Sequence, residues 1–588
     1  MKKFLLIFLA FFFALFLLYP LFTLLGGAFY VETQFQGHTL RHFSLQYFLI
    51  IFENPFYREC FINSLLLAVW TTLFCLLLSI PLAWVFTRRI FPGKQILSRL
   101  LLLPLILPPF VGAIGLKQFF ARFGSLNLLL NHIGLIDLKH PPDWFGSGGF
   151  FGIILLQVLH LYPILFLSVQ AALANLDPSL RDAAQNLGAR GWHVFRSITL
   201  PLAMPGIFAG ASIVFVGAFT DLGVPLMFDF QTTVPTQIFN LVTQTDNPLG
   251  YALVVLTLAL VAIIFLLGRK CGEGNYSMLG RSAVHSDVIR LKPAAGCVVT
   301  CSILFLIGVS ILPHLSVILQ SFAARWFMTV LPAQWSGEYF TEIFHLELTT
   351  LSIRNSLFYS ICSAALDLLL GLGIAWLLAR EKFKGRSLLD VMAMLPLALP
   401  GLVLAFAYFT AFSHPPLDPS WFGIMPAHSA WIQSFNRVWL SIFDPRQNPF
   451  VLLVVAYSVH RLPYIVRAAF AGFQQMSVSL EEASANLGAR PWQTLLKISV
   501  PLIGANLIAG GILVFSFAML DVSNGMVLAQ ESRFYPMTKA IYSLMGRITP
   551  TAPSIACALG VLSMLLLAAS LFMASRLLGR RMGQLFKA

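Results

Sequence analysis

The sequence predicts an all-α membrane protein that crosses the bilayer about twelve times. Of its 588 residues, 58% are apolar and only 11% are charged, and the mean hydropathy is +0.81. Water-soluble chains carry roughly a quarter charged residues, so this composition excludes a soluble globular protein. The apolar residues gather in runs of about 20, which is the length that crosses the hydrocarbon core of a bilayer.

The runs form two groups of six on either side of a polar, basic linker at 269–292. The first half, 1–268, contains runs near 4–26, 61–86, 99–121, 149–173, 204–228 and 249–268. The second half, 293–588, contains runs near 296–321, 355–379, 388–411, 449–471, 504–526 and 554–576. The first run is longer than the apolar core of a signal peptide and no small-residue cleavage site closes it, so we expect a retained helix. A cleaved signal peptide is the alternative.

Basic residues predict the orientation of the spans. Lys and Arg gather at 88–99, 181–196, 269–292, 380–386 and 576–587. Because cytoplasmic loops carry an excess of these residues, we expect these segments and both termini to be cytoplasmic. The same bias accounts for the net charge of +14, so no nucleic-acid partner is expected. An even number of spans in each half makes the halves parallel repeats.

The two halves also repeat each other in residue identity. Asn63-Ser64 recurs as Asn355-Ser356, and Pro104 recurs as Pro396. Beyond the outer loop 412–448 the offset grows by eight residues, and the string Asn-Leu-Gly-Ala-Arg-x-Trp occurs at 186–192 and at 486–492. The sequence therefore predicts a fused pseudo-dimer, with the transport pathway expected between its halves.

The best-preserved part of the repeat is a cytoplasmic loop between the fourth and fifth runs, at 177–201 and at 477–501. Ser179-Leu-Arg-Asp182 and Ser479-Leu-Glu-Glu482 have the pattern of a capped helix start. Gly188 and Gly488 are expected to end this first short helix in the left-handed conformation.

A second short amphipathic helix is predicted after each glycine, ending at Pro201 or Pro501. Its apolar face carries Trp192, Phe195 and Ile198 in the first copy and Trp492, Leu495 and Ile498 in the second. A loop preserved only by duplication is the alternative, but it does not explain why this loop is more similar than the spans. We expect both copies to contact the same kind of cytoplasmic surface.

These loops resemble the EAA loops in the permease subunits of binding-protein-dependent ABC importers. The matched residues are Asp182, Ala183, Gly188, Arg190 and Pro201 in the first copy, and Glu482, Ala483, Gly488, Arg490 and Pro501 in the second. The resemblance implies that each loop is a coupling loop seated on one of two copies of an ATPase subunit, and that an external binding protein delivers the substrate. Asp182 in place of Glu, and Ser484 in place of the second Ala, leave open whether the two loops are equivalent.

The chain itself is not expected to hydrolyse ATP. Its only Gly-Lys pair, Gly93-Lys94, is followed by Gln95 and lacks the glycine spacing of a phosphate-binding loop. We therefore expect a translocation subunit in the bacterial inner membrane that is not an enzyme and binds no cofactor, with ATP bound by the partner subunit. No metal site or disulfide framework is expected from the His and Cys spacing.

Histidines and prolines recur at matching places inside the spans. His160 and His460 are interpreted as hydrogen-bonding residues beside proline kinks, with metal ligation as the alternative. The third run of each half is expected to be broken by its prolines, which are Pro104, Pro108 and Pro109 in one half and Pro396 and Pro400 in the other. Such a break is either a hinge or a tolerated kink. The outer loops 122–148 and 412–448 either receive the binding protein or cover the bundle.

Two acidic residues, Asp221 and Asp521, lie at matching positions in the fifth run of each half. A carboxylate in hydrocarbon costs on the order of 3 kcal/mol, so each either lines the translocation pathway or caps a neighbouring helix. Asp221-Leu-Gly223 is similar to the Asp-Phe-Gly segment of ferric-iron uptake permeases, among which fused chains are common. That resemblance implies a ferric substrate; thiamine, phosphonate and polyamine are the alternatives.

Two other classes of protein are alternatives. An ion-coupled secondary transporter also has two parallel six-helix halves, but it has no use for paired cytoplasmic loops. A membrane-embedded enzyme is disfavoured because no catalytic spacing recurs inside the spans.

Overall fold

The computed structural model describes residues 2–35, 38–146, 149–242, 247–272, 289–416 and 430–578. Within these ranges the chain is mainly helical, with three short two-stranded pairings. Nine described helices are long and apolar enough to cross a membrane, and three bent helix pairs raise this number to twelve. The predicted all-α fold with about twelve spans is confirmed. The predicted linker 269–292 and the two predicted outer loops lie partly outside the described residues.

The chain folds into two compact units, each assembled from separate segments. Unit 1 contains Met1–Asn54, Ile238–Leu258 and Glu338–Ala588, and unit 2 contains Pro55–Gln237 and Ala259–Gly337. Each unit therefore combines most of one sequence half with the first span of the other. The compact units do not coincide with the halves 1–268 and 293–588, which describe the repeat.

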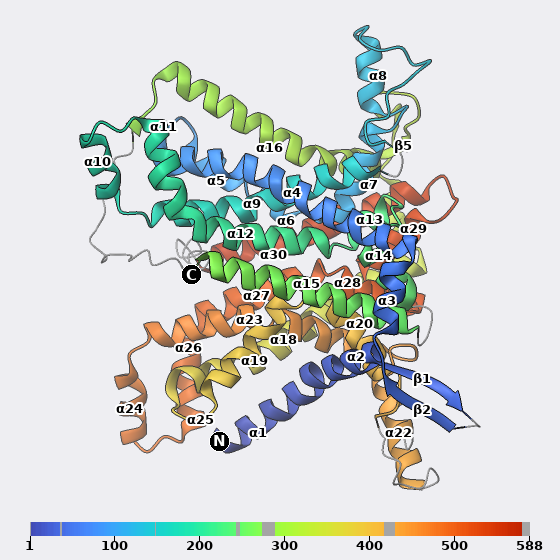
Figure 1. Cartoon of the computed structure of the whole chain (residues 1–588), viewed down its shortest axis with the longest axis vertical. Helices are drawn as coiled ribbons and strands as arrows, with labels where there is room; N and C mark the ends of the chain where they lie inside the picture. Colours follow the sequence, from blue (N-terminus) through green and yellow to red (C-terminus); the bar gives the residue numbers. More distant parts are fainter. Residues whose placement is uncertain are drawn as a thin grey trace. The chain divides into compact units, whose positions relative to one another are not determined.

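Unit 2 is built around four long helices (Figure 1). The elements of its first segment are α4 (Pro55–Arg88), β3 (Arg89–Ile90), α5 (Lys94–Leu100), α6 (Leu103–Ile106), α7 (Pro109–Phe120), α8 (Ser125–His132), α9 (Phe150–Ala174), α10 (Pro178–Asn186), α11 (Gly191–Val194), a π-helical turn (Phe195–Thr199), α12 (Leu200–Phe219) and α13 (Gly223–Met227). Its second segment adds β4 (Ile289–Arg290), which pairs in parallel with β3, then α16 (Pro293–Ser321) and the antiparallel strands β5 (Ala323–Arg325) and β6 (Gln334–Trp335). Two helices, α14 (Val234–Val242) and α15 (Pro248–Gly272), have residues in both units.

Unit 1 opens with the first span, which comprises α1 (Lys2–Phe13), a π-helical turn (Ala14–Leu18) and α2 (Tyr19–Phe29). The hairpin β1 (Tyr30–Phe35) and β2 (His38–Phe43) and then α3 (Gln46–Glu53) follow. The elements of the second half are α17 (Glu338–Glu342), α18 (Glu347–Arg380), α19 (Arg386–Ala398), α20 (Gly401–Phe412), α22 (Ala430–Phe443), α23 (Phe450–Gln475), α24 (Val478–Asn486), α25 (Pro491–Thr494), a π-helical turn (Leu495–Ser499), α26 (Val500–Leu502), α27 (Gly504–Met519), α28 (Ser523–Leu528), a 3-10 turn (Ser532–Phe534), α29 (Met537–Met545) and α30 (Ala552–Leu578).

The third span is broken in both halves, as its prolines predict. The axis turns by 92° before α7 and by 105° between α19 and α20. In a continuous helix the carbonyl of Pro104 would accept from the N–H of residue 108, but Pro108 has none. The Nδ1 of His160 lies 2.9 Å from this carbonyl oxygen and replaces the missing donor. The interpretation of His160 as an interhelical hydrogen-bonding residue beside a kink is confirmed.

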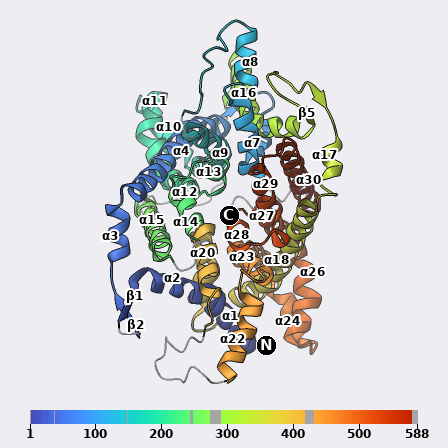
Figure 2. The same ribbon diagram turned by 90° about the vertical axis from the view of Figure 1, so that its right-hand side faces the viewer.

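The first span of each half packs against the broken third span of the other half. In unit 1, the Tyr19 hydroxyl donates to the carbonyl of Ala411 at 3.1 Å, and the Tyr408 hydroxyl donates to that of Phe16. Figure 2 shows the resulting contact of α2 with α20. In unit 2, α16 packs on α7, and the Nε2 of His314 lies 3.3 Å from the carbonyl oxygen of Pro108.

The repeated Asn-Ser pair fixes the start of α14 in the first half and of α29 in the second. In both halves the Asn amide donates to a carbonyl of the preceding loop, and the Ser hydroxyl accepts the first N–H of the helix. The contacts are Asn63 to Thr232 at 3.1 Å, Ser64 from Val234 at 2.8 Å, Asn355 to Arg533 at 2.8 Å, and Ser356 from Met537 at 2.7 Å. This shared part of the sequence repeat is therefore explained by the placement of α14 and α29.

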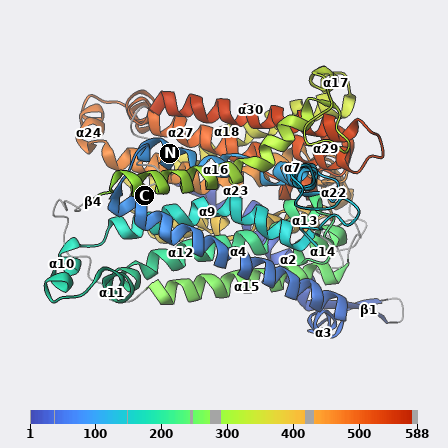
Figure 3. The same cartoon turned by 90° about the horizontal axis from the view of Figure 1, so that it is seen from above.

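The short helices of the repeated loop lie at one end of each unit. In unit 2, α10 and α11 are at the end opposite α8 and α13 (Figure 1). In unit 1, α24 is at the end opposite α17 and α29 (Figure 3). Lys2 lies at the α24 end of unit 1, where its Nζ is 2.8 Å from Glu381. Each unit thus has one end with a repeated loop and one end with the irregular segments.

The packing of α16 on α7 predicts that Gly115 tolerates no side chain. A Cβ on Gly115 would lie 1.9 Å from the carbonyl oxygen of Pro313, so Gly115→Ala forces the helices apart. We expect a loss of about 1–3 kcal/mol, the usual cost of overpacking, measured as a lower unfolding temperature of the detergent-purified protein. Gly308→Ala is the control, because nothing lies within 4 Å of a Cβ there. Equal unfolding temperatures for the two variants would contradict the described packing.

Candidate functional site

The repeated loop begins with the short helices α10 and α24. The carboxylate of Asp177 accepts the N–H of Ser179 at 2.9 Å, and the hydroxyl of Ser477 accepts that of Ser479 at 3.3 Å. The N-caps are therefore Asp177 and Ser477, and the predicted capping boxes that start at Ser179 and Ser479 are wrong. In the first copy Pro178 takes the first helical position, which its fixed φ angle suits. The Ser179 N–H also lowers the pKa of the exposed Asp177 carboxyl.

Both short helices end at the predicted glycine. Gly188 has φ of 88° and Gly488 has φ of 84°, in the left-handed region. In the first copy, Ala189 donates to Ala184 at 3.0 Å and Gly188 donates to Gln185 at 2.9 Å, which is the Schellman pattern. The same two bonds close the second copy. The prediction that these glycines end the first helix is confirmed.

The second short helix does not end at the proline in the first copy. From α11 the chain continues through a π-helical turn into α12, which contains Pro201. In this turn the N–H of Leu200 donates to the carbonyl of Phe195, five residues back instead of four. The regular pattern of helical hydrogen bonds is therefore already interrupted where Pro201 follows. The predicted break at Pro201 is therefore wrong. In the second copy the helix axis turns by 77° at residue 503, two positions beyond Pro501.

Large apolar side chains are exposed on both copies of the loop. Leu187 and Leu487 are each 89% exposed, and Trp192 and Trp492 are 72% and 47% exposed. Neither Leu packs into its own unit, although burying a Leu side chain contributes about 1.5–3 kcal/mol. Exposed apolar groups gathered at matching places indicate an interaction surface. We call the exposed surface of α10 and α11, or of α24 and α25, with the intervening residues 187–190 or 487–490, the loop tip.

The structure places most of the predicted loop residues on these tips. Those that are exposed are Ala183, Gly188 and Arg190 in the first copy, and Glu482, Ala483, Gly488 and Arg490 in the second. The side chain of Asp182 lies outside the described set. Ser484, a departure from the EAA pattern, is buried and shares a hydrogen bond of 2.9 Å with Thr494. The hydroxyl group that Ser484 has and alanine lacks therefore finds its hydrogen-bond partner within the same loop.

Asp221 caps the short helix that follows the fifth span of the first half. Its Oδ1 accepts the N–H of Gly223 at 3.0 Å, and its Oδ2 accepts Gln157 at 3.1 Å. Gln157 in turn accepts the hydroxyl of Thr71 at 3.0 Å. Within the described part of the chain, the polar contacts of this carboxylate are with neutral groups. Whether Asp221 and Gly223 also face the substrate stays a prediction.

Asp521 occupies the same place in the second half but has a charged partner. Its Oδ1 accepts the N–H of Asn524 at 2.9 Å, and its Oδ2 lies 3.1 Å from Arg461 and 3.8 Å from His460. The first half has Leu161 in place of Arg461. The two halves therefore hold matching carboxylates in different electrostatic surroundings.

Sequence reasoning missed Arg461 and a second charged group, Asp367. Asp367 is fully buried in α18 and accepts the hydroxyl of Ser458. Both residues lie inside predicted spans, where a charge is costly and is paired or functional. A search of the apolar runs for charged residues would have found them.

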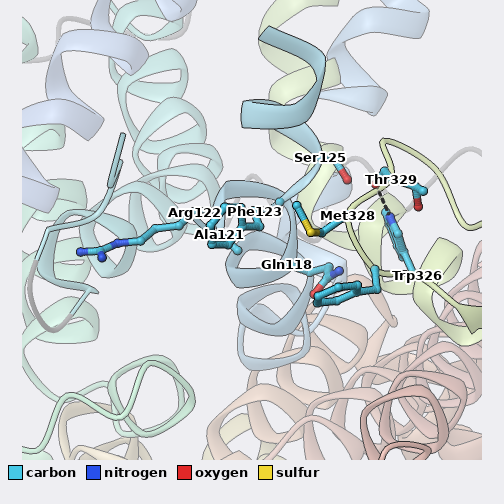
Figure 4. Close-up of a pocket in the computed structure, with 10 residues that line it drawn as sticks. Gln118, Ala121, Arg122, Phe123, Ser125, Trp326, Met328 and Thr329 are labelled. Atoms are coloured by element: carbon cyan, nitrogen blue, oxygen red, sulfur yellow. Dashed lines mark hydrogen bonds between the residues drawn. The ribbon is translucent and has the colours of Figure 1, made fainter. Parts of the chain in front are cut away.

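The described residues contain no group of three or more His, Cys, Asp or Glu side chains that could hold a metal ion. A cavity of about 260 Å³ lies in unit 2, beside the end of α7 (Figure 4). Its walls come from Gln118, the segment 121–125 and the segment 326–329, and the Trp326 indole donates to Thr329 at 3.0 Å. The cavity is lined by the end of α7, the start of α8 and the segment that follows β5.

Nine to twelve spans among the described residues, in two repeated halves with a matching loop tip in each, fit a membrane transport protein of the permease class. The family model of the binding-protein-dependent transport system inner membrane component matches residues 63–270 and again 368–584. The chain belongs to this family. The predicted resemblance to a fused permease of this kind is confirmed, and the protein is placed in the bacterial inner membrane.

Several known proteins resemble the chain. The putative ferric transport system permease protein FbpB 1 of Haemophilus influenzae is 26% identical, over 86% of this chain and 75% of that protein. The ferric transport system permease protein FbpB of Actinobacillus pleuropneumoniae is 25% identical, over 86% and 69%. The molybdenum transport system permease protein ModB of Escherichia coli is 32% identical, over 37% and 94%. The crystal structure of a bacterial ABC transporter involved in the import of the acidic polysaccharide alginate has 20% identity and a TM-score of 0.35, over 45% and 93%.

The contacts of Asp221 predict different results for two substitutions. Asp221→Ala removes the acceptor at the start of α13, which costs about 1 kcal/mol, and we expect slower substrate uptake and a lower unfolding temperature. Asp221→Asn keeps a side-chain oxygen for Gly223 and is expected to keep uptake within about twofold of wild type, since the cap survives. Uptake rates in membrane vesicles decide between capping and a pathway charge. If Asp221→Asn lowers the uptake rate as much as Asp221→Ala does, the charge of the carboxylate itself has a role in transport.

Proposed function

We propose that the chain is the translocation subunit of an ATP-driven importer that moves ferric iron into the cytoplasm. An external binding protein delivers the iron, and two copies of a separate ATPase subunit supply the energy. The ATPases dock on the two repeated loops, 177–201 and 477–501, through Asp182, Ala183, Gly188, Arg190 and Pro201 in one copy and Glu482, Ala483, Gly488, Arg490 and Pro501 in the other. Both termini and both tips are cytoplasmic, and the chain holds no cofactor of its own.

One observation carries the docking proposal, which is the matching exposure of Leu187 and Leu487 on two tips of the same design. A solvent-exposed Leu at the end of a polar helix contributes nothing to its own unit, and two such residues at equivalent sites fit two identical partners. The glycine-ended helix holds each Leu in a fixed place. A rigid apolar anchor of this kind suits a cleft in a partner.

The ferric substrate is supported by the length of the shared region. The two relatives named for ferric transport match across both halves and cover 86% of this chain. The relative named for molybdenum transport is more similar in identity but covers only 37% of the chain, because it corresponds to a single half. The fused build therefore favours the ferric group. Asp221-Leu-Gly223 in the fifth span supports the same substrate.

In the proposed cycle, binding of ATP closes the ATPase dimer and draws the two loop tips together. The spans that leave each tip, α12 and α27, transmit this movement to the membrane, and the pathway opens outward to receive iron. Hydrolysis reverses the change. The closed ATPase dimer binds one conformation of the permease more tightly than the other, and this difference in binding free energy drives the conformational change.

The exposed leucines predict a loss of ATPase binding without a loss of folding. We expect the double variant Leu187→Ser with Leu487→Ser to retain its unfolding temperature, because neither side chain is packed. Co-purified ATPase should fall about tenfold or more, since each Leu contributes about 1.5–3 kcal/mol when buried in a partner. Ile548→Ser, at an equally exposed residue between α29 and α30, is the control. If the double variant co-purifies as much ATPase as the wild type, the loop tips are not part of the ATPase interface.

The substrate is tested with the purified permease, the ATPase and the binding protein in proteoliposomes. We expect uptake of radioactive ferric iron that needs all three components and ATP, and that excess molybdate or thiamine does not inhibit. Uptake driven by an ion gradient without ATP would instead indicate a secondary transporter. ATP-dependent uptake of molybdate, thiamine, phosphonate or polyamine, with no uptake of iron, would support an ATP-driven importer but would show that its substrate is not ferric iron.

A further inference from the structure

Helix α22 runs across the spans of unit 1 and not along them. It lies at the end opposite α24, and its axis crosses the direction of α18 and α23, which are two of the helices long enough to span a membrane (Figures 1 and 3). The spans set the direction of the membrane normal. A helix that crosses them therefore lies roughly parallel to the membrane surface.

Aromatic side chains hold the C-terminal half of α22 against the first span and α20. The centre of the Trp439 ring is 5.6 Å from that of Phe412, the last residue of α20, and 6.4 Å from that of Tyr19. The Phe443 ring lies 5.5 Å from the same Phe412 ring. Ring pairs of this kind contribute about 0.5–1.5 kcal/mol each beyond the area that they bury. This half of α22 is therefore fixed to the unit.

A polar link joins the same end of α22 to the end of α20. Asp444 directly follows α22 and is 3% exposed, and its Oδ1 lies 3.0 Å from the Nε of Arg446. The guanidinium of Arg446 also donates to the carbonyl of Ser413, the C-cap of α20. Carbonyls at the end of a helix have no partner within that helix. Arg446 satisfies this one and so ties the two helix ends together.

These contacts place α22 near one boundary of the hydrocarbon core. Lys2 lies at the α24 end of unit 1, beside Glu381. Tyr19 is about 26 Å farther along the first span, at the rise of an α-helix. The hydrocarbon core of a bilayer is about 30 Å thick. With Lys2 at one boundary, Tyr19 and the Trp439 ring beside it are close to the other.

The remaining large apolar side chains of α22 form a stripe that unit 1 leaves exposed. Its members are Trp431, Phe435, Val438 and Ile442, with exposed fractions of 68%, 39%, 57% and 41%. Their spacing puts them on one face of the helix. Ile432, on the neighbouring packed face, is 5% exposed. The apolar side of α22 is thus half covered by unit 1 and half uncovered.

Polar residues occupy the other side of α22. They are Gln433, Ser434, Arg437 and Ser441, and all four are exposed. A wide apolar side that carries tryptophan, opposite a polar side, is typical of a helix that lies in a membrane interface. The apolar side of such a helix enters the boundary between headgroups and acyl chains, and the polar side faces water.

We propose that the exposed stripe of α22 is buried in lipid, at the level where headgroups meet acyl chains. Lipid is favoured over a soluble partner, such as the proposed binding protein, because a soluble partner would leave the four side chains in water whenever it dissociates. Since Arg446 ties α22 to α20, the lipid holds this end of the broken third span at a constant depth. The assignment to the outer leaflet rests on the proposed orientation, but the burial in lipid does not.

Spin labels on the full chain, in nanodiscs of phosphatidylethanolamine and phosphatidylglycerol, measure the depth of the stripe. The native cysteines are replaced by alanine, and the label is placed by Val438→Cys in the stripe or, as the matched control, by Ser441→Cys on the polar side of the same helix. We expect the label at position 438 to lie about 5–10 Å into the boundary between headgroups and acyl chains. It should collide with dissolved oxygen more than with an aqueous nickel chelate, and the label at position 441 should show the reverse.

Two results of this experiment would overturn the proposal. Equal access of the nickel chelate to both labels would place the stripe in water. If the chelate loses access to position 438 only after purified binding protein is added, the stripe is a docking face for that protein and not for lipid.

Tryptophan fluorescence tests the same burial with the native cysteines in place. The signal of Trp431 is the difference between the wild type and Trp431→Phe, and lipid brominated near its headgroup should quench most of it, whereas aqueous acrylamide should not. The control is the signal lost in Trp192→Phe, because Trp192 is 72% exposed on the first loop tip and should be quenched by acrylamide alone. If acrylamide quenches both signals equally, the proposal is wrong. Neither experiment needs an ATPase or transport, so the result is independent of the proposed function.

Discussion

The fold depends on satisfying backbone carbonyls at a break inside the membrane. A carbonyl without a partner in hydrocarbon costs several kcal/mol, and the prolines of the third span create such groups at a fixed place. The first half meets this demand with Tyr162, His160 and His314, which contact the carbonyls of Leu101, Pro104 and Pro108. The third of these comes from α16, so the first span of the second half is needed at the break of the first.

Sequence patterns predicted the parts of the fold that depend on composition and on single special residues. Hydrophobicity predicts the twelve runs. The missing N–H of proline predicts the breaks in the third spans, and the positive φ angle open to glycine predicts the helix ends at Gly188 and Gly488. Each of these causes acts within its own segment. The caps of α10 and α24 were placed two residues late, because Asp177 and Ser477 compete with an equally suitable serine. The helix continues through Pro201 because a π-helical turn precedes this residue, and no sequence pattern predicts that turn. The exchange of first spans requires contacts between distant residues, which no local pattern records.

Duplication explains the common design, and divergence explains how the two halves differ. Asp221 is held by neutral groups, whereas Asp521 faces Arg461, and the end of α18 is tied to Glu481 where the first copy has Arg181. Inside the spans the second half has Arg461 and the buried Asp367 where the first half has Leu161 and Cys75. Since a fused chain needs no symmetry between its halves, each can be altered separately, which two copies of a half-length permease cannot do.

The exchange of first spans has a consequence for how the protein is made. The hydroxyl of Tyr19 bonds to the carbonyl of Ala411, which lies 392 residues later in the chain. At a synthesis rate of about 5–20 residues per second, roughly 20 to 80 seconds pass before the ribosome supplies that partner. During this interval the newly inserted amino-terminal helix waits in the lipid, stable as a single helix but without its final neighbours. Neither half can finish folding before the other has been translated, so assembly is completed only late in biogenesis.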